Sequence, residues 1–224
     1  AMTTFFSYQD SGLDDWDPTK NHLQMGFRPG FAVQARELTQ MQTLLQNQIS
    51  ALAKRFLKNG SLIDASLDLT SPPNGIGTWG VSLNTGYIYI IPQGKDIGYF
   101  VHNNTVLSPD SPVIGDADRN TYVYARIEEV QINPEGNETP AMGGYSRVSV
   151  DPTLVDNAQG FANHNAPGAS RYQINILNLG SYLEGDSLPV NAVNLFYIKA
   201  TQGVGSGNIP YYIDTNEPIP FTGG

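Results

Sequence analysis

Residues 26 to 63 read GFRPGFAVQARELTQMQTLLQNQISALAKRFLKNGSLI, and their spacing is clearly helical. The large apolar residues recur at steps of three and four, which places them on one stripe about 27 Å long. This stripe consists of Leu38, Met41, Leu45, Ile49, Leu52 and Phe56. A Pro29-Gly30 turn precedes the helix, and Asn59-Gly60 supplies the left-handed stop that helices commonly use. We therefore expect a helical segment over 26–63 whose apolar stripe is buried.

The period changes from helix to strand after this segment. Alternating runs on both sides of Asn84-Thr85-Gly86 predict a hairpin. In the run 121–132, Tyr122, Tyr124 and Arg126 alternate with apolar residues, so one side of this strand is predicted to be buried. Further strand patterns are separated by connectors rich in Gly, Pro, Asn and Asp, and no crossover helix is indicated. The sequence predicts an α+β, mostly β fold, with an antiparallel β-sandwich or open barrel over 64–200.

The two ends of the chain have the composition of arms. Residues 1–25 are acidic and aromatic without periodicity, and burying a large aromatic side chain is worth on the order of 2–3 kcal/mol. The aromatic residues of this segment that we expect to dock are Phe5, Phe6, Tyr8 and Trp16. Two destinations are open for them, the chain's own sheet or a neighbouring subunit. Residues 201–224 are rich in Gly and Pro and are predicted to form a C-terminal arm or linker.

Composition narrows the class of protein. The chain has 224 residues, no Cys, 15% charged residues and a formal net charge of −9. The absence of Cys excludes disulfides and thiolate metal sites, and the acidic balance argues against nucleic acid as a partner. The sequence contains no apolar run long enough for membrane insertion.

No pattern of catalytic, cofactor-binding or metal-binding residues stands out. Asp116 to Asn120 has the early spacing of a calcium loop but lacks its later glycine and glutamate, and His22, His102 and His164 are far apart in sequence. The carboxylates lie in turns or strands, and no GxSxG elbow occurs. The glycine-rich 203–208 is followed by Pro210, which argues against a phosphate loop opening a helix. We therefore predict that the chain is not an enzyme and binds neither cofactor nor metal.

Two segments resemble a family of tailed-phage virion proteins. The first is FRPGFAVQARELTQMQTLLQNQI, followed by a short linker and KNGSLI, and the second is DPTLVDNAQGFANHNAPGASRYQINI in 151–176. Members are baseplate, tail-fibre or fibre-adaptor components that carry a domain of unknown function. The resemblance implies a structural subunit that is made in the host cytoplasm and placed in the tail or baseplate of the virion. It also implies self-association, with a trimer favoured, and contacts with other tail, baseplate or fibre proteins.

A second functional class stays open from the residues alone. Exposed aromatic rings can stack on sugars, so the chain is alternatively a carbohydrate-binding module for receptor recognition. The rings available for stacking would be those of Trp79, Tyr87, Tyr89, Tyr99, Tyr211 and Tyr212. Because aromatic residues that alternate within strands are commonly core residues, we favour the assembly role, with the helix for self-association and the N-terminal arm for docking.

Overall fold

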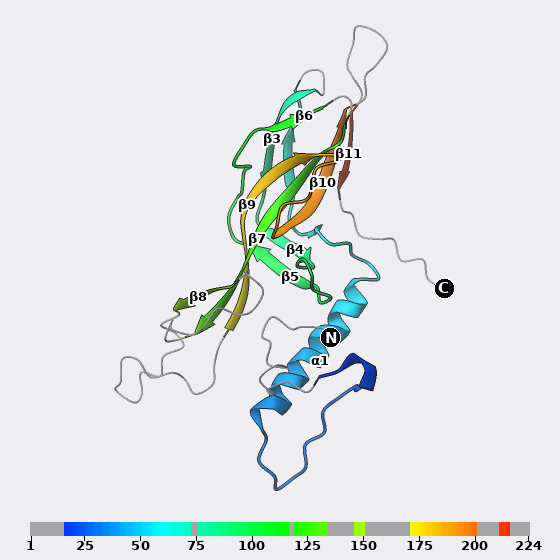
Figure 1. Cartoon of the computed structure of the whole chain (residues 1–224), viewed down its shortest axis with the longest axis vertical. Coiled ribbons are helices and arrows are strands. Elements are labelled where there is room, and N and C mark those ends of the chain that lie inside the picture. The colour runs from blue at the N-terminus through cyan, green and yellow to red at the C-terminus, as the bar shows by residue number, and fades with distance from the viewer. Residues whose placement is uncertain are drawn as a thin grey trace. The chain divides into compact units, whose positions relative to one another are not determined.

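The computed structural model describes residues 16–72, 76–116, 119–133, 146–150, 171–200 and 211–215 (Figure 1). Within these residues the chain forms the helix α1 (Ala35–Ala53), a short 3-10 turn at Pro18–Lys20, and eleven strands. The strands are β1 Ser61–Ile63, β2 Leu67–Thr70, β3 Gly77–Leu83, β4 Gly86–Ile90, β5 Tyr99–Asn103, β6 Val113–Gly115, β7 Thr121–Asn133, β8 Ser146–Val150, β9 Arg171–Leu183, β10 Ala192–Ala200 and β11 Tyr211–Thr215.

The helix begins at a local capping arrangement. The Glu37 carboxylate accepts the backbone N–H of Gln34 at 2.9 Å, and the Gln34 carbonyl accepts the N–H of Glu37 at 3.1 Å. The glutamate contact is one half of a capping box, because the acceptor on Gln34 is its backbone carbonyl and not its side chain. The preceding residues are not helical, because Arg28 to Phe31 form a turn in which Gly30 has a φ of +84°. The helix is therefore shorter at its start than the predicted segment 26–63.

Asn59 and Gly60 act differently from the predicted helix stop, because α1 has already ended at Ala53. The Asn59 side chain accepts the Ile91 N–H at 2.7 Å and donates to the Ile91 carbonyl at 3.0 Å. Gly60 has a φ of +90° and donates its N–H to the Tyr89 carbonyl at 2.8 Å. The pair thus fastens the chain after the helix to β4, and the prediction of a stop at this position was wrong.

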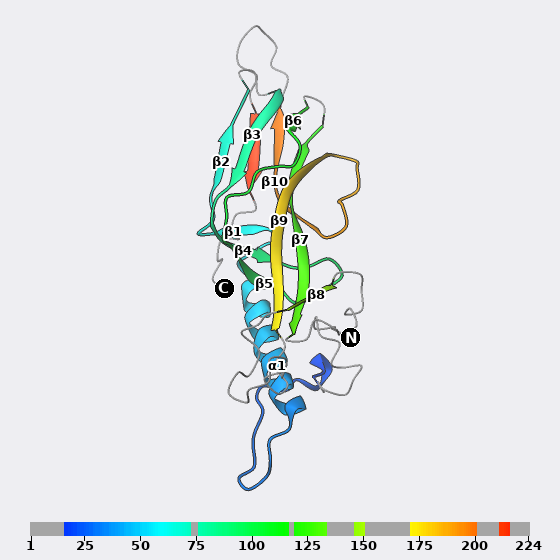
Figure 2. The same ribbon diagram turned by 90° about the vertical axis from the view of Figure 1, so that its left-hand side faces the viewer.

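The strands form three sheets, with the orders β1-β4-β5, β2-β3-β6 and β11-β10-β7-β8, and β9 also pairs with β7. The pairing of β7 with β8 is parallel, whereas the pairings of β1 with β4, β4 with β5, β2 with β3, β3 with β6 and β10 with β7 and β11 are antiparallel. Figure 2 shows β10 and β11 side by side. This content confirms the α+β, mostly β class, while a sandwich or open barrel stays a prediction.

The predicted hairpin at Asn84-Thr85-Gly86 does not form. Its two strands belong to different sheets, since β3 pairs with β2 and β6 while β4 pairs with β1 and β5. The Asn84 N–H donates to the Ser66 carbonyl at 2.8 Å instead of closing a turn. Gly86 has a φ of +148°, and a Cβ there would lie 2.4 Å from the Ala65 backbone nitrogen. The glycine serves a close backbone approach between segments rather than a hairpin turn.

The predicted alternation along β7 is confirmed. Val123, Ala125 and Ile127 are buried on one side, while Tyr122 and Tyr124 on the other side are only half-buried. Since successive side chains of a strand point to opposite faces, the apolar set contributes to the core. Other fully buried core residues are Leu83, Ile88, Ile90, Leu179, Leu195 and Ile198.

The chain divides into two compact units, residues 1–46 with 128–175 and residues 47–127 with 176–224. This division differs from the four consecutive segments expected from the sequence, because both units combine residues that are distant along the chain. The expected C-terminal arm, 201–224, includes β11, which pairs with Phe196–Ala200 of β10. That part of the segment belongs to the sheet and is not a linker.

Candidate assembly surface

The apolar stripe of α1 faces solvent. Leu38, Leu45, Ile49 and Leu52 retain 45%, 49%, 55% and 63% of their surface exposed. Met41 and Phe56, at the other positions of the stripe, are half-buried. The expectation that this stripe packs into the core of the chain was therefore wrong.

The opposite face of α1 is the buried one, and it is made of polar and small residues. Its buried members are Gln40, Thr43, Leu44, Ser50 and Ala53. Only one of them is a large aliphatic residue. The helix is thus inverted relative to an ordinary surface helix, whose apolar face meets the core and whose polar face meets water.

Contacts near Ser50 explain why this face is polar. The Ser50 hydroxyl accepts the Gly98 backbone N–H at 2.8 Å, and its carbonyl lies 3.5 Å from the Tyr89 hydroxyl. One turn further, the Lys54 ammonium donates to the Asp96 carbonyl. These groups come from β4 and from the segment before β5, and the Ser50 hydroxyl gives the buried Gly98 N–H an acceptor that it would otherwise lack.

Tyr89 lies at the centre of this contact. Its side chain is fully buried, and burial raises the pKa of its hydroxyl, an effect that the hydrogen bond with Ser50 partly offsets. The ring lies 5.3 Å from that of Phe100 on β5. A Cβ at Gly98 would lie 2.0 Å from the Tyr89 hydroxyl oxygen, so only glycine leaves room for this ring. The helix is therefore held from its polar side.

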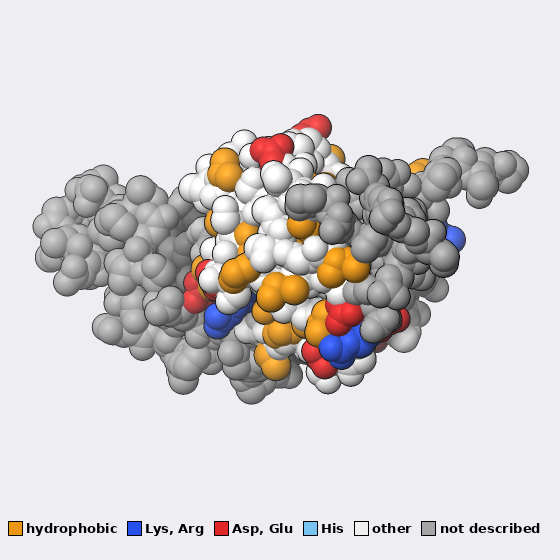
Figure 3. Space-filling model, turned by 90° about the horizontal axis from the view of Figure 1, so that it is seen from above, with side chains coloured by type: hydrophobic (Ala, Val, Ile, Leu, Met, Phe, Trp, Pro, Cys, Tyr) orange, Lys and Arg blue, Asp and Glu red, His pale blue; other side chains and the backbone are white. Residues whose placement is uncertain are grey.

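The exposed stripe is unusual because its residues are contiguous. Scattered surface hydrophobic residues are normal, and on the face drawn in Figure 3 hydrophobic side chains form patches among backbone atoms and other side chains. Along α1, by contrast, Leu38, Leu45 and Leu52 recur every seven residues with Met41 and Ile49 between them. Burying one such side chain is worth about 1.5–3 kcal/mol. An exposed contiguous stripe of this kind is a candidate surface for a protein partner.

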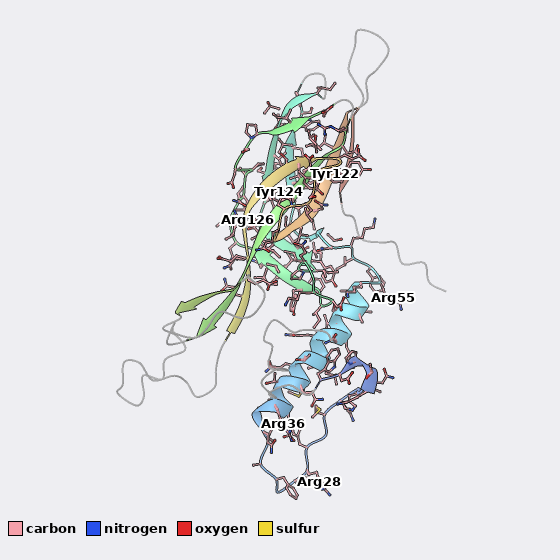
Figure 4. All side chains as sticks on the ribbon, in the orientation of Figure 1. Arg28, Arg36, Arg55, Tyr122, Tyr124 and Arg126 are labelled. Carbon is pink, nitrogen blue, oxygen red and sulfur yellow. The ribbon has the colours of Figure 1, made fainter. Side chains whose placement is uncertain are left out.

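The loop before α1 also exposes large apolar residues, which sequence reasoning missed. Phe27, Phe31 and Val33 are 46%, 72% and 49% exposed. The Arg28 guanidinium lies over the Phe31 ring, 5.6 Å from its centroid. Figure 4 shows Arg28 on this loop and Arg36 at the start of α1. The sequence did contain a signal for this exposure, because Phe27 and Phe31 flank the Pro29-Gly30 turn. Residues on both sides of a tight turn tend to face solvent.

The predicted docking arm is described in part. Phe5, Phe6 and Tyr8 lie outside the described residues. Trp16 is 8% exposed, so it belongs to the buried part of the chain and is not free to dock on a partner. Directly after it, the Asp17 carboxylate accepts the Thr19 N–H at 2.8 Å and the Thr19 hydroxyl at 2.7 Å. These hydrogen bonds hold the pKa of Asp17 below its usual value.

Two of the six aromatic rings proposed for sugar stacking are buried. Trp79 and Tyr89 are 2% and 0% exposed, so neither can present a ring face. Tyr87 is exposed and makes an edge contact with His102 at 4.7 Å between centroids. Tyr99 is half-buried, and the side chains of Tyr211 and Tyr212 are outside the described residues.

A different group of tyrosines meets on the polar side of β7. The rings of Tyr122 and Tyr182 stack at 5.2 Å, Tyr197 lies 5.6 Å from Tyr122, and Tyr124 lies 6.0 Å from Tyr182. Figure 4 labels Tyr122 and Tyr124 on β7, with Arg126 following on the same strand. The Asn194 amide donates to the Tyr182 hydroxyl at 2.8 Å, and burial raises the pKa of Tyr182. These rings pack on one another as an aromatic cluster, and rings in such contacts have less free face for stacking on a sugar.

Two of the described residues considered for metal binding, Asp116 and His102, contact neighbouring side chains. Asp116 pairs with Arg119 at 3.7 Å, and Ala117 and Asp118 lie outside the described residues, as does His164. His102 contacts the Asn104 side chain. Across the described ranges, no group of three or more His, Asp or Glu side chains is placed to hold a metal ion. Among the same residues, no helix is both long and apolar enough to cross a membrane.

Comparison with known proteins adds little. No protein-family model matches the chain, and no curated protein matches it. A solved structure described as the crystal structure of TssK is similar over 84% of this chain and 40% of its own length, with 11% identity and a TM-score of 0.31. A likeness of this degree supports no inference about function.

Proposed function

We propose that this chain is a structural virion subunit of a bacteriophage tail, a baseplate or tail-fibre adaptor that associates with copies of itself through the apolar stripe of α1. The stripe carries the proposal, because Leu38, Leu45, Ile49 and Leu52 are exposed along one helix face. The phage setting rests on the resemblance of 27–49 and 151–176 to tailed-phage virion proteins.

Self-association suits the stripe better than a small ligand does. Leucines seven residues apart, at 38, 45 and 52, present the spacing with which helices pack side by side. Gln48 and Arg55 lie at the alternate positions of the same seam, so it is not uniformly apolar. Polar residues within such a seam fix register and the number of helices at a cost in stability. A trimer is the stoichiometry we propose, on the resemblance alone.

In this proposal the chain has no catalytic role. Asp116, the first residue of the calcium-like spacing, pairs with Arg119. The alternative function, a carbohydrate-binding module, has less support, because Trp79 and Tyr89 are buried and the tyrosines near β7 stack on one another. A glycan array without hits, together with an oligomer in solution, is the expected result.

The phage setting is tested on intact particles. Cryo-EM of tailed-phage virions that encode this chain should show density for α1 and the β-sheets in the tail or baseplate, with α1 in contact with a neighbouring copy. Mass spectrometry of purified virions is the control for presence. Particles that infect normally and lack the chain would contradict a structural role in the virion.

A further inference from the structure

The loop before α1 combines apolar exposure with positive charge. Phe27, Phe31 and Val33 are exposed, and Arg28 lies over the Phe31 ring. Lys20, Arg28 and Arg36 supply positive charge to 16–36, where Asp17 is the only acidic residue, although the whole chain carries −9. The Asp17 carboxylate is hydrogen-bonded to Thr19. We call Phe27, Arg28, Phe31 and Val33 the turn surface.

The turn that carries this surface has a defined shape. The Phe31 N–H donates to the Arg28 carbonyl at 3.4 Å, and Gly30 at the turn has a φ of +84°. Pro29 before it has a fixed φ, so the loop has little freedom to lose when a partner binds. A cation stacked on an exposed ring suits a partner that brings both aromatic rings and carboxylates.

The N-terminal segment of this chain has that chemistry. Residues 1–15 contain Phe5, Phe6 and Tyr8 together with Asp10, Asp14 and Asp15, and they contain no Lys or Arg. Aromatic residues would meet the exposed Phe27 and Phe31, and the carboxylates would meet Arg28. Opposite charges on the two surfaces also steer their encounter.

We infer that residues 1–15 of one copy dock on the turn surface of a neighbouring copy. The inference rests on the proposed self-association, which brings a second copy within reach. A segment of this length spans up to about 50 Å when extended at about 3.3 Å per residue. Exchange of arms between copies interlocks an oligomer without requiring a new fold.

Cysteine cross-linking tests this contact, because the chain contains no Cys. Ser7→Cys places a thiol on the arm, and Gly26→Cys places one beside the turn surface. A Cβ at Gly26 would meet nothing within 4 Å, so this substitution fits the structure. A tagged Ser7→Cys chain is mixed with an untagged Gly26→Cys chain and oxidised. The expected product is a mixed disulfide-linked dimer, resolved by mass.

Ser187→Cys is the matched control, since Ser187 is exposed and far along the chain from the turn surface. Mixed dimer no more abundant with Cys at 26 than with Cys at 187 overturns the inference. A chain carrying both Ser7→Cys and Gly26→Cys that forms only an internal disulfide also overturns it, because the arm then docks on its own chain.

Charge reversal gives a second readout. Arg28→Glu in the Gly26→Cys chain should lower the yield of mixed dimer roughly two- to fivefold, the range expected for an exposed ion pair. Asp14→Lys with Asp15→Lys in the arm of the Ser7→Cys chain should restore the yield of mixed dimer. If neither change alters that yield, the contact has no electrostatic basis. Light scattering on the same samples separates the two proposals: an oligomer without cross-linking overturns the arm contact alone, and a monomer without cross-linking overturns both.

Discussion

Gly98 leaves room for the Tyr89 ring, and Tyr89 in turn reaches the carbonyl of Ser50 on α1. Tyr89 and Gly98, about 40 to 50 residues after Ser50, therefore fix how the second half of the helix meets β4. None of them stands out by type in the sequence, because Ser50 reads as one more polar position of a surface helix. Their roles depend on close approach, which spacing along the chain does not reveal.

Gly98→Ala should destabilise the fold. Its Cβ would lie 2.0 Å from the Tyr89 hydroxyl oxygen, and the fully buried ring has little space in which to move. We expect a loss of about 1–3 kcal/mol in the free energy of unfolding, the usual cost of overpacking. Urea denaturation measures it, with Gly26→Ala as the control in open space. Equal midpoints for the two variants would show that Tyr89 is not held as described.

The lowered pKa of Asp17 makes the stability of the fold depend on pH, with a sign that can be stated. The hydrogen bonds from Thr19 hold its pKa below 3.8 in the folded chain. A carboxyl with a lowered pKa stabilises the fold above its ordinary pKa, and that contribution is lost as the pH falls through the lowered value. Thr19→Ala removes the hydroxyl donor, so the pKa of Asp17 should rise. NMR titration of the Asp17 carboxyl measures it, and an unchanged pKa would contradict the hydrogen-bond account.

At the scale of elements, the sequence predicted which residues share a face better than it predicted where each face points. The β7 alternation was confirmed because a strand in a sheet has one side toward its own core. For α1 the stripe was identified residue by residue, yet its orientation was wrong. Periodicity shows that Leu38, Leu45 and Leu52 lie together, and it does not show whether their partner is the same chain or another one.

The two faces of α1 should therefore respond differently to mutation. Ser50→Ala leaves the buried Gly98 N–H without its acceptor, and we expect a loss of about 1–3 kcal/mol in unfolding free energy. Leu45→Ala should change the unfolding free energy of the dilute monomer by less than about 0.5 kcal/mol, because the side chain is half exposed. Gln46→Ala, on an exposed polar position, is the control. A larger loss of unfolding free energy for Leu45→Ala than for Ser50→Ala would show that the stripe is buried in the core.

Hairpins were predicted less well than strands. Asn84-Thr85-Gly86 has the composition of a tight turn, but Gly86 is required by the approach of the Asp64–Ala65 backbone. Likewise, Asn59 and Gly60 have the composition of a helix stop, but they bind the end of β4. Glycine and asparagine indicate positions with an unusual backbone conformation or a close backbone contact. Local sequence does not reveal which distant segment makes that contact.

For the whole molecule, the sequence predicted the mostly β class and missed how the chain divides. Each compact unit joins residues from separate stretches, so boundaries inferred from composition at 25, 63 and 200 could not reveal the division. The turn surface was missed for a related reason. Exposure of Phe27 and Phe31 follows from the structure of the loop and has no periodic signal.

Removal of the arm tests docking at this scale. Because Trp16 is buried, a deletion of residues 2–20 would also damage the fold, and the cut should end at Asp15. The chain lacking 2–15 should keep its thermal midpoint and lose incorporation into particles, as followed by immunoblot of purified virions. A truncated chain that unfolds or aggregates would place the arm in the core. Normal incorporation would direct the search for the docking surface elsewhere on the chain.

Multi-angle light scattering of the purified chain tests the central claim, that the exposed stripe of α1 is where copies associate. The wild-type chain should have a mass that is a multiple of the 24.4 kDa monomer, with threefold expected. Leu45→Gln combined with Leu52→Gln should return it toward 24.4 kDa, and Gln46→Ala, beside the stripe, should leave it unchanged. A wild-type mass of 24.4 kDa at high concentration, or a variant that keeps the wild-type mass, would contradict the claim.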